Sequence, residues 1–438
     1  MPPPLKPGSA PNDSASTAGL ASLAALSLVV GGASGLLGAI FRRALEAADR
    51  HRGALTIWAQ GMDLWGLAAL VAICAAATAL AAWLVRRFSP EASGSGIPHV
   101  EAVLNKRVPQ APLRLIPVKF LGGWLAIGAG LALGREGPTV QMGASIAHLI
   151  GRLGRRNVDD CLTLLAAGAG AGLATAFNAP IAGAVFVIEE LLRRFETRSS
   201  IATLGASASA IAVSRVILGE GPDFTVAESP YPGLGALPFF LGLGIVAGLA
   251  GVAYNRAILG ALAVGVTLKS KRVPVEVQAA SIGGVVGTIA WFAPHLVGGG
   301  DALTERTLTH PAPVAMVAAM LAVRFALGPL SYAARTPGGL FAPMLAVGTQ
   351  LGVIYGAIVG GWFPRIESSP TAAGVVGMAA FFTAVVRAPM TGIVLVIEMT
   401  GSFTLLLPML AACFGSMLVP TLLREPPIYD SLAEDRRR

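Results

Sequence analysis

The sequence is poor in charge, in aromatic side chains and in cysteine. Charged residues are only 13% of its 438 residues, against about a quarter in soluble domains, while apolar residues make up 54%. Aromatic residues are 6%, and no basic stripe is interleaved with them, so the net charge of +8 does not indicate a nucleic-acid partner. Cys74, Cys161 and Cys413 are isolated in apolar runs, which argues against disulfides and against a cysteine metal site. We therefore predict neither a metal nor a cofactor.

Long uncharged runs predict a membrane protein with many spans. Residues 20–41 and 64–85 carry no charge, and each run holds 22 residues, enough to cross a bilayer. Further apolar blocks recur as far as residue 423, and several are short or are interrupted by glycine and proline. Broken backbone is tolerated at membrane depth only where it is buried or lines a cavity. The expected fold is an all-α polytopic membrane protein with broken and re-entrant helices.

Internal similarity indicates a duplicated architecture. Residues 177–190 and 386–399 are identical at seven of fourteen positions, including an Ala-Pro pair, a glycine and a glutamate. The glycine and proline pattern of residues 134–151 recurs with the same spacing at 339–356. Both motifs keep their order in the chain. Because transporters often form their substrate sites where the broken helices of two repeats meet, we predict two repeats of inverted topology.

The division of the chain follows from these repeats and from its ends. We predict a first membrane repeat at 19–218 and a second at 235–423. Residues 1–18, rich in proline, serine and alanine, are predicted to be a disordered tail rather than a signal peptide. Residues 424–438 are predicted to be a short cytoplasmic C-terminal segment. The stretch 86–119 holds six lysine and arginine residues, and the positive-inside rule places it, and with it both termini, in the cytoplasm.

An ionisable pair stands between two apolar segments at residues 134–140, which read Gly-Arg-Glu-Gly-Pro-Thr-Val. A charged group inside hydrocarbon is costly, so it marks an ion or proton pathway unless a partner neutralises it. The flanking glycines and Pro138 predict a backbone break followed by a helix start. A helix N-terminus presents free N–H groups and the positive end of a dipole, which bind anions. The alternative is a simple loop with a structural pair between Arg135 and Glu136.

Four motifs in this order resemble the CLC chloride channel and transporter family, over nearly the whole chain from about residue 20 to 432. The motifs are Gly94-Ser-Gly-Ile-Pro98, Gly134-Arg-Glu-Gly-Pro138, Gly338-Gly-Leu-Phe-Ala-Pro343 and Tyr429. The resemblance implies a homodimer in a lipid bilayer, with a separate pathway in each subunit. It is closest to prokaryotic members, because the chain has no room for the family's cytoplasmic regulatory modules.

The resemblance also implies a set of site residues. Glu136 is expected to be the gating glutamate, which occupies the outer anion site when ionised and swings out when protonated, and Glu190 the inner proton-transfer glutamate. Neutral donors suit chloride, because they stabilise the ion without holding it too tightly to leave. The expected chloride-binding residues are Ser95, Leu340, Phe341 and Tyr429. The backbone of the anion loops is expected to include Gly94, Gly96, Arg135 and Gly137.

Each of these residues also has a structural interpretation. Ser95 fits a flexible turn, Leu340 and Phe341 fit ordinary apolar packing, and Tyr429 fits an interfacial anchor. Glu190 and its neighbour Glu189 fit a charged helix end. Two further positions depart from the expected pattern or have no predicted role beyond structure: Arg335, where many relatives carry small residues, and Glu398, the repeat mate of Glu189.

The sequence thus predicts a secondary transporter that exchanges chloride for protons in the bacterial inner membrane, and not an enzyme. The closest alternative is a passive chloride channel of the same fold, and the presence of both Glu136 and Glu190 favours coupled exchange. An intramembrane serine protease is the alternative from another class, because Gly32-Ala-Ser-Gly35 resembles the serine loop of rhomboid proteases. A serine nucleophile needs a base within hydrogen-bond reach, and no histidine lies in a convincing partner segment for Ser34.

Overall fold

The structure, a computed structural model, describes residues 17–224, 226, 232–362 and 369–435. Over these residues the chain forms seventeen α-helices and no named strand. Nine of the helices in this part of the chain are long and apolar enough to cross a membrane. The prediction of an all-α polytopic fold is therefore confirmed. The predicted tail lies outside the described residues, apart from Thr17 and its neighbour, which begin the first helix.

The first half of the molecule runs from α1 to α8. Its first span is longer than the uncharged run of the sequence, because the helix continues through a charged segment as far as Gln60. The helices of this half are α1 (Thr17–Gln60), α2 (Asp63–Phe88), η1 (Pro90–Ala92), α3 (Ile97–Leu104), α4 (Leu115–Gly128), α5 (Glu136–Leu153), α6 (Val158–Phe177), α7 (Pro180–Phe186), the π-helix η2 (Val187–Leu192) and α8 (Thr197–Leu218).

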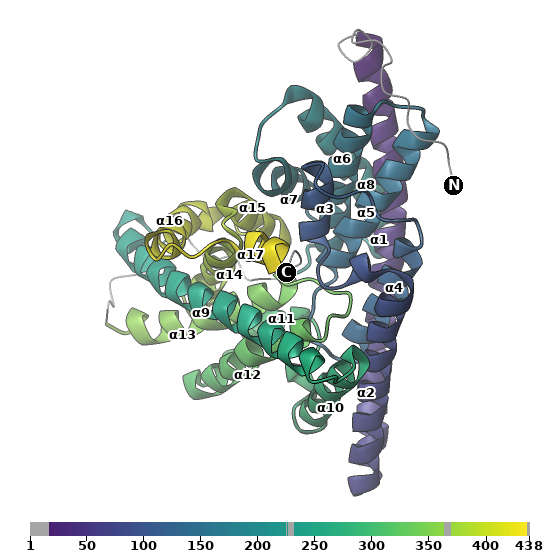
Figure 1. The fold of residues 1–438 in the computed structure, drawn as a ribbon. Coiled ribbons are helices and arrows are strands. Elements are labelled where there is room, and N and C mark those ends of the chain that lie inside the picture. The colour runs from purple at the N-terminus through teal and green to yellow at the C-terminus, as the bar shows by residue number, and fades with distance from the viewer. Residues whose placement is uncertain (1–16, 225, 227–231, 363–368, 436–438) are drawn as a thin grey trace.

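The second half repeats this order and is followed by one further helix. Its helices are η3 (Leu234–Ala236), α9 (Leu237–Ser270), α10 (Val275–Phe292), η4 (Pro294–Leu296), α11 (Asp301–Thr309), α12 (Val314–Ala333), α13 (Phe341–Gly360), α14 (Pro370–Val386), α15 (Pro389–Thr400), η5 (Phe403–Leu405), α16 (Leu406–Leu422) and α17 (Ile428–Asp435). The halves lie on either side of the molecule in Figure 1. Helix α1 packs on α8 and α5 on α6, just as α9 packs on α16 and α13 on α14. Across the halves, α2 packs on α10 and α7 on α15.

Glycine brings the paired helices of each half into backbone contact. A Cβ on Gly143 of α5 would collide with the carbonyl of Gly168 in α6. In the second half, a Cβ on Gly348 of α13 would collide in the same way with the carbonyl of Gly377 in α14. Small residues at a membrane interface let backbones approach closely, and packing replaces the hydrophobic effect that drives association in water. The two repeats therefore use the same device at matching positions.

Two glutamates, one from each repeat, form hydrogen bonds between the halves. Glu189 of η2 accepts hydrogen bonds from the N–H groups of Met390 and Thr391 at the start of α15, at 3.0 and 2.7 Å. Its repeat mate Glu398 accepts two from the start of α7, at 3.1 and 2.7 Å. The first N–H groups of a helix have no partner within the helix, and a carboxylate there also meets the positive end of the dipole. Each half thus caps a helix of the other.

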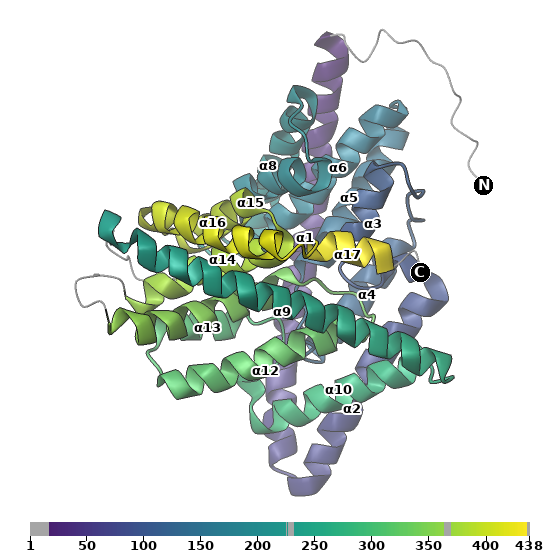
Figure 2. The same ribbon diagram turned by 60° about the vertical axis from the view of Figure 1, so that its left-hand side comes forward.

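The last helix, α17, lies between the halves (Figures 1 and 2). It packs on α3 of the first half and on α9 and α14 of the second. Ile428 and Tyr429 are fully buried and Leu432 nearly so. The described part of the predicted C-terminal segment is therefore an amphipathic helix that is built into the core.

Candidate functional site

Three loops that are distant in the sequence join through backbone hydrogen bonds. The Gly94 N–H donates to the carbonyl of Thr336 at 3.1 Å, and the Gly338 N–H donates to the carbonyl of Gly94 at 3.2 Å. Gly134 and Gly339, which are repeat mates, exchange two hydrogen bonds of 2.9 and 2.7 Å. The three glycine-rich motifs of the sequence thus meet at one centre. Helix α3 starts from the first loop, α5 from the second and α13 from the third.

The Glu136 side chain occupies the start of α13. One carboxylate oxygen, Oε1, accepts a hydrogen bond of 2.7 Å from the backbone N–H of Phe341. The residue is fully buried, and its second oxygen has no hydrogen-bond partner among the described residues. A Cβ on Gly134 or on Gly339 would collide with this carboxylate, so the side chain can occupy this place only because both residues are glycine. An anionic group therefore sits at a helix N-terminus, where backbone N–H groups and the dipole favour negative charge.

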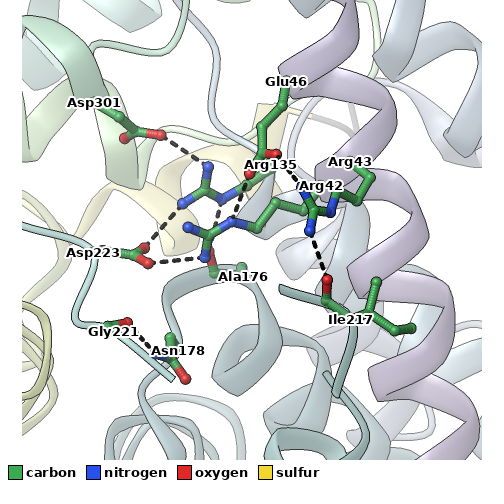
Figure 3. Close-up of polar contacts among 10 residues, drawn as sticks. All are labelled: Arg42, Arg43, Glu46, Arg135, Ala176, Asn178, Ile217, Gly221, Asp223 and Asp301. Atoms are coloured by element: carbon green, nitrogen blue, oxygen red, sulfur yellow. Dashed lines mark hydrogen bonds and ion pairs between the residues drawn. The ribbon is translucent and has the colours of Figure 1, made fainter. Parts of the chain in front are cut away.

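Arg135 points away from its neighbour Glu136. Its guanidinium donates to Asp301 at 2.9 Å and to Asp223 at 3.0 Å, and its Nε donates to the carbonyl of Ala176 at 2.7 Å (Figure 3). No ion pair between Arg135 and Glu136 occurs in the part of the chain that the structure describes. The interpretation of the loop as a structural Arg–Glu pair is therefore wrong.

The partners of Arg135 form a cluster at the side of the site. Asp223, in the segment after α8, is nearly buried and is shared by Arg135 and Arg42, the latter at 2.8 Å (Figure 3). The next residue, Phe224, donates its N–H to the carbonyl of Met399 in α15 at 3.0 Å. This segment thus ties α1 and α5 of the first half to α15 of the second. Sequence reasoning missed Asp223, whose only signal is its position in a weakly charged loop.

A cavity of about 140 Å³ borders the Glu136 loop. Gly134 and Arg135 line it, together with Asp49 and Arg52 of α1 and Asp301 of α11. Both signs of charge face this cavity, and Arg52 pairs with Asp49 at 2.7 Å. The cavity therefore has a polar lining beside the loop that carries Glu136. The sequence did not point to it, because its residues come from separate helices.

The Ser95 and Tyr429 side chains lie close together. Both hydroxyls are buried, and neither has a hydrogen-bond partner in the described part of the chain. The ring of Tyr429 packs on Phe341, with centroids 6.1 Å apart. A Cβ on Gly137 would lie 2.6 Å from the Ser95 carbonyl oxygen, so this glycine allows the loop to approach α5. Because unpaired buried donors are costly, two such hydroxyls fit an anion-binding role.

Lys119 binds the backbone of the first loop. Its ammonium group is fully buried and donates to the carbonyls of Ala92 and Gly94, at 3.0 and 2.7 Å. In the same loop Gly94 and Gly96 have φ angles of +63° and +86°, which favour glycine. We did not predict a role for this lysine, although a charge within an apolar block is itself a signal.

Arg335 enters the third loop in a left-handed conformation, with φ of +56°. Its carbonyl accepts a hydrogen bond of 3.1 Å from the Ser93 hydroxyl. Its guanidinium makes no hydrogen bond or ion pair with the described residues, and the effect of this departure on ion affinity stays a prediction.

Glu190 lies at the opposite side of the site, in the π-helix η2. π-Helical turns often occur at functional sites. In this one, the Glu189 side chain reaches α15, and the neighbouring Glu190 is buried, at 4% exposed. Glu190 lines a cavity of about 460 Å³ together with Arg193, Arg194 and Arg387. No hydrogen bond among the described residues joins Glu190 to Glu136, but Tyr429 lies within electrostatic range of both.

Ser34 does not form a catalytic pair. It is buried in α1, and its hydroxyl has no hydrogen-bond partner in the described part of the chain. Without a base in reach, its hydroxyl cannot act as an activated nucleophile.

The fold and the site define a class of protein: a helical membrane protein of two repeats, in which helix starts converge on a buried carboxylate and on unpaired hydroxyls. A model of the family described as "Voltage gated chloride channel" matches residues 77–421. The chain therefore belongs to this family, the CLC family.

Characterised relatives cover nearly the full chain. An H(+)/Cl(-) exchange transporter, ClcA, of Vibrio cholerae is 40% identical over 417 residues, which are 93% of this chain and 88% of that protein. The crystal structure of a slow cyanobacterial Cl-/H+ antiporter is similar with a TM-score of 0.90 and 32% identity, and covers 95% of this chain and 98% of that one. A CLC-type fluoride/proton antiporter, at 22% identity and a TM-score of 0.78 over 94% of this chain and 98% of that one, shares the fold alone.

Proposed function

We propose that this protein is a secondary active transporter that exchanges chloride for protons. The observation that carries the proposal is the Glu136 carboxylate bound to the Phe341 N–H, where three glycine-rich loops meet. The similarity to H(+)/Cl(-) exchange transporters supports it. These relatives are transporters and not enzymes, and the Ser34 hydroxyl has no hydrogen-bond partner in the described part of the chain, so nothing favours the protease alternative.

Glu136 acts as the outer gate. Its ionised carboxylate competes with chloride for the same backbone N–H at the start of α13. Protonation removes the negative charge, so the side chain leaves the helix start and the N–H groups of Leu340 and Phe341 become available to the anion. One negative charge replaces another, which links proton binding at Glu136 to chloride binding.

Chloride binds through neutral donors. The hydroxyls of Ser95 and Tyr429 meet the ion from the inner side, and the backbone N–H groups of Leu340 and Phe341 meet it from α13. The unpaired state of both hydroxyls in the structure supports this assignment. The backbone of the first two loops completes the site at Gly94, Gly96, Arg135 and Gly137. Donors without a full charge allow the ion to leave again.

Protons take a separate inner route that begins at Glu190. The chloride donors are arranged to replace the water of an anion and offer no acceptor to a proton. A second carboxyl beside a cavity, at Glu190, gives protons their own entrance, which joins the chloride path at Glu136. The membrane setting follows the resemblance: a homodimer in the lipid bilayer of a bacterial inner membrane, with both termini cytoplasmic and no cofactor.

Proton flux against a gradient distinguishes the exchanger from a passive channel of the same fold. The purified protein is reconstituted into liposomes with a chloride gradient and no initial pH gradient. An exchanger uses the chloride gradient to move protons uphill, and the pH of the lumen changes until an ionophore collapses it. Chloride flux with no uphill proton movement would contradict the proposal and establish the channel.

A further inference from the structure

Arg193 faces three carboxylates from three different elements. Its Nη2 lies 2.7 Å from Asp430 of α17, 3.8 Å from Glu190 of η2 and 3.9 Å from Glu101 of α3. The side chains of Glu190 and Glu101 are 5% and 11% exposed, whereas that of Arg193 is 46% exposed. The guanidinium therefore lies beside two buried carboxylates, and it lines a cavity together with one of them, Glu190.

Asp430 fixes Arg193 in this place. Arg193 ends η2 with a left-handed φ of +52°, and its Nε donates to the Glu190 carbonyl at 3.3 Å. Both terminal nitrogens then reach Asp430, at 2.7 and 3.5 Å. A guanidinium fork that meets a carboxylate with two nitrogens is held in direction as well as in distance. The hydrogen bonds to Asp430 also raise the pKa of Arg193, so the guanidinium stays charged.

We infer that Arg193 is a positioning residue for proton transfer: it holds ionised Glu190 toward the inner solution, and Asp430 anchors Arg193 there. The inference rests on the proposed role of Glu190. The charged groups closest in effect to Glu190 are Arg193 and Glu189 from its own segment, Glu101 from α3 and Asp430 from α17, and Arg194 and Arg387 line the same cavity. Of the other helices packed on η2, α7 carries no charged side chain and α6 carries its two only in the first turn.

The pair also links the proton route to the chloride site. When Glu190 takes up a proton, its attraction to Arg193 falls, and the side chain is released to turn inward. Asp430 directly follows Tyr429, whose hydroxyl is proposed to bind chloride, so the anchor of Arg193 belongs to the helix that positions this donor. The two terminal nitrogens of Arg193, both bonded to Asp430, thus connect the end of η2 to α17.

Arg193→Gln tests the position of the charge. Proton flux is expected to fall at high pH, where the Glu190 carboxylate no longer takes up a proton. Loss of a nearby cation makes the carboxyl harder to ionise, so the midpoint of this fall moves to higher pH by about half a unit to one unit, since the charge is partly screened. Chloride flux measured in the same liposomes stays close to that of the parent. An unmoved midpoint would overturn the inference.

Asp430→Asn separates positioning from a direct field effect. If Asp430 acted on Glu190 only through its own negative charge, its removal would ease ionisation and move the midpoint to lower pH. If Asp430 anchors Arg193, its removal displaces the cation, and the midpoint moves to higher pH, as in Arg193→Gln. A shift to lower pH, or none, would exclude the anchor.

Three controls keep the test interpretable. Arg194→Gln removes the adjacent and more exposed arginine, which pairs with Glu196, and leaves the midpoint unchanged. Arg193→Lys keeps the charge, so the pH midpoint of its proton flux lies nearer to that of the parent than the midpoint of Arg193→Gln does. Size-exclusion elution of each variant shows whether it is folded. Glu190→Gln distinguishes a failure of the proposed function from a failure of the inference about Arg193. If it leaves proton flux intact, the proposed role of Glu190 is wrong. If it abolishes proton flux while Arg193→Gln has no effect, only the inference about Arg193 is wrong.

Discussion

The two repeats differ most at the positions where we propose the chemistry. Glu136 of the first half corresponds to Phe341 of the second, and Glu190 corresponds to Met399. By contrast, Glu189 is retained as Glu398, and both carboxylates cap a helix of the other half. Where the halves share a residue, it performs the same structural task twice. Where they differ, one half alone carries an ionisable group.

Electrostatics explains why the proposed gate, Glu136, occurs in one repeat only. The two repeats aim two helix starts at one centre, and Gly134 and Gly339 bring them into backbone contact. A carboxylate on each start would place two like charges side by side, which raises the cost of ionising both. A single carboxylate can instead use the N–H of the other start, and Phe341 supplies this donor together with an aromatic wall. This asymmetry fits the proposal of one anion site within a frame of two similar repeats.

The largest effect is expected from removing the charge that breaks this symmetry. Glu136→Gln keeps the size of the side chain but replaces the carboxyl with an amide, which does not titrate. Anion flux should persist, and uphill proton movement should fall to the background of protein-free liposomes. Both fluxes are measured in the same vesicles. Proton pumping at the parental ratio would contradict the gating role.

The inner glutamate should give a similar loss by a different route. Glu190→Gln should abolish proton movement while chloride flux continues, because Ser95 and Tyr429 are unchanged. Glu189→Gln is the matched control one residue earlier, and it should keep the exchange ratio. Equal ratios in Glu190→Gln and the parent would mean that Glu190 is only a helix-end charge.

The repeat fold and the three loops could be predicted because they depend on local patterns. Uncharged runs indicate spans, and glycine with proline indicates helix starts, wherever the rest of the chain lies. The placement of α17 did not follow from local patterns, since its apolar face is short and nothing in the sequence states which helices cover it; only the family resemblance placed Tyr429 with Ser95 and Phe341. The roles of the individual site residues remain predictions.

The partners of Arg135 show the limit of sequence reasoning. An arginine beside a glutamate suggests a local pair, yet the guanidinium reaches Asp223 and Asp301, far along the chain. Ion pairs depend on directions in space, which the order of residues does not contain. For the same reason Arg193 and Asp430 were not connected before the structure brought η2 and α17 together.

Tyr429 sharpens the comparison because α17 has no counterpart in either repeat. Tyr429→Phe removes one hydroxyl donor and keeps the ring that packs on Phe341. A hydrogen bond to a charged group is worth about 1.5–3 kcal/mol, so chloride affinity should fall by roughly ten-fold or more. Calorimetric titration with chloride measures this change. Unchanged affinity would mean that Tyr429 is only a structural anchor.

The smallest effect on transport is expected where the repeats agree. Glu398→Gln weakens two charge-assisted hydrogen bonds at a helix start, and Glu189→Gln weakens three, because the Thr391 hydroxyl also donates to Glu189 at 2.7 Å. Each should destabilise the fold by about 1–2 kcal/mol, with the larger loss in Glu189→Gln, while the ratio of protons to chloride stays that of the parent. Thermal unfolding in detergent, followed by size-exclusion elution, measures the first quantity, and paired flux assays measure the second. A changed exchange ratio in Glu398→Gln would break the comparison, since a residue kept in both halves would then act in transport and not only in the frame.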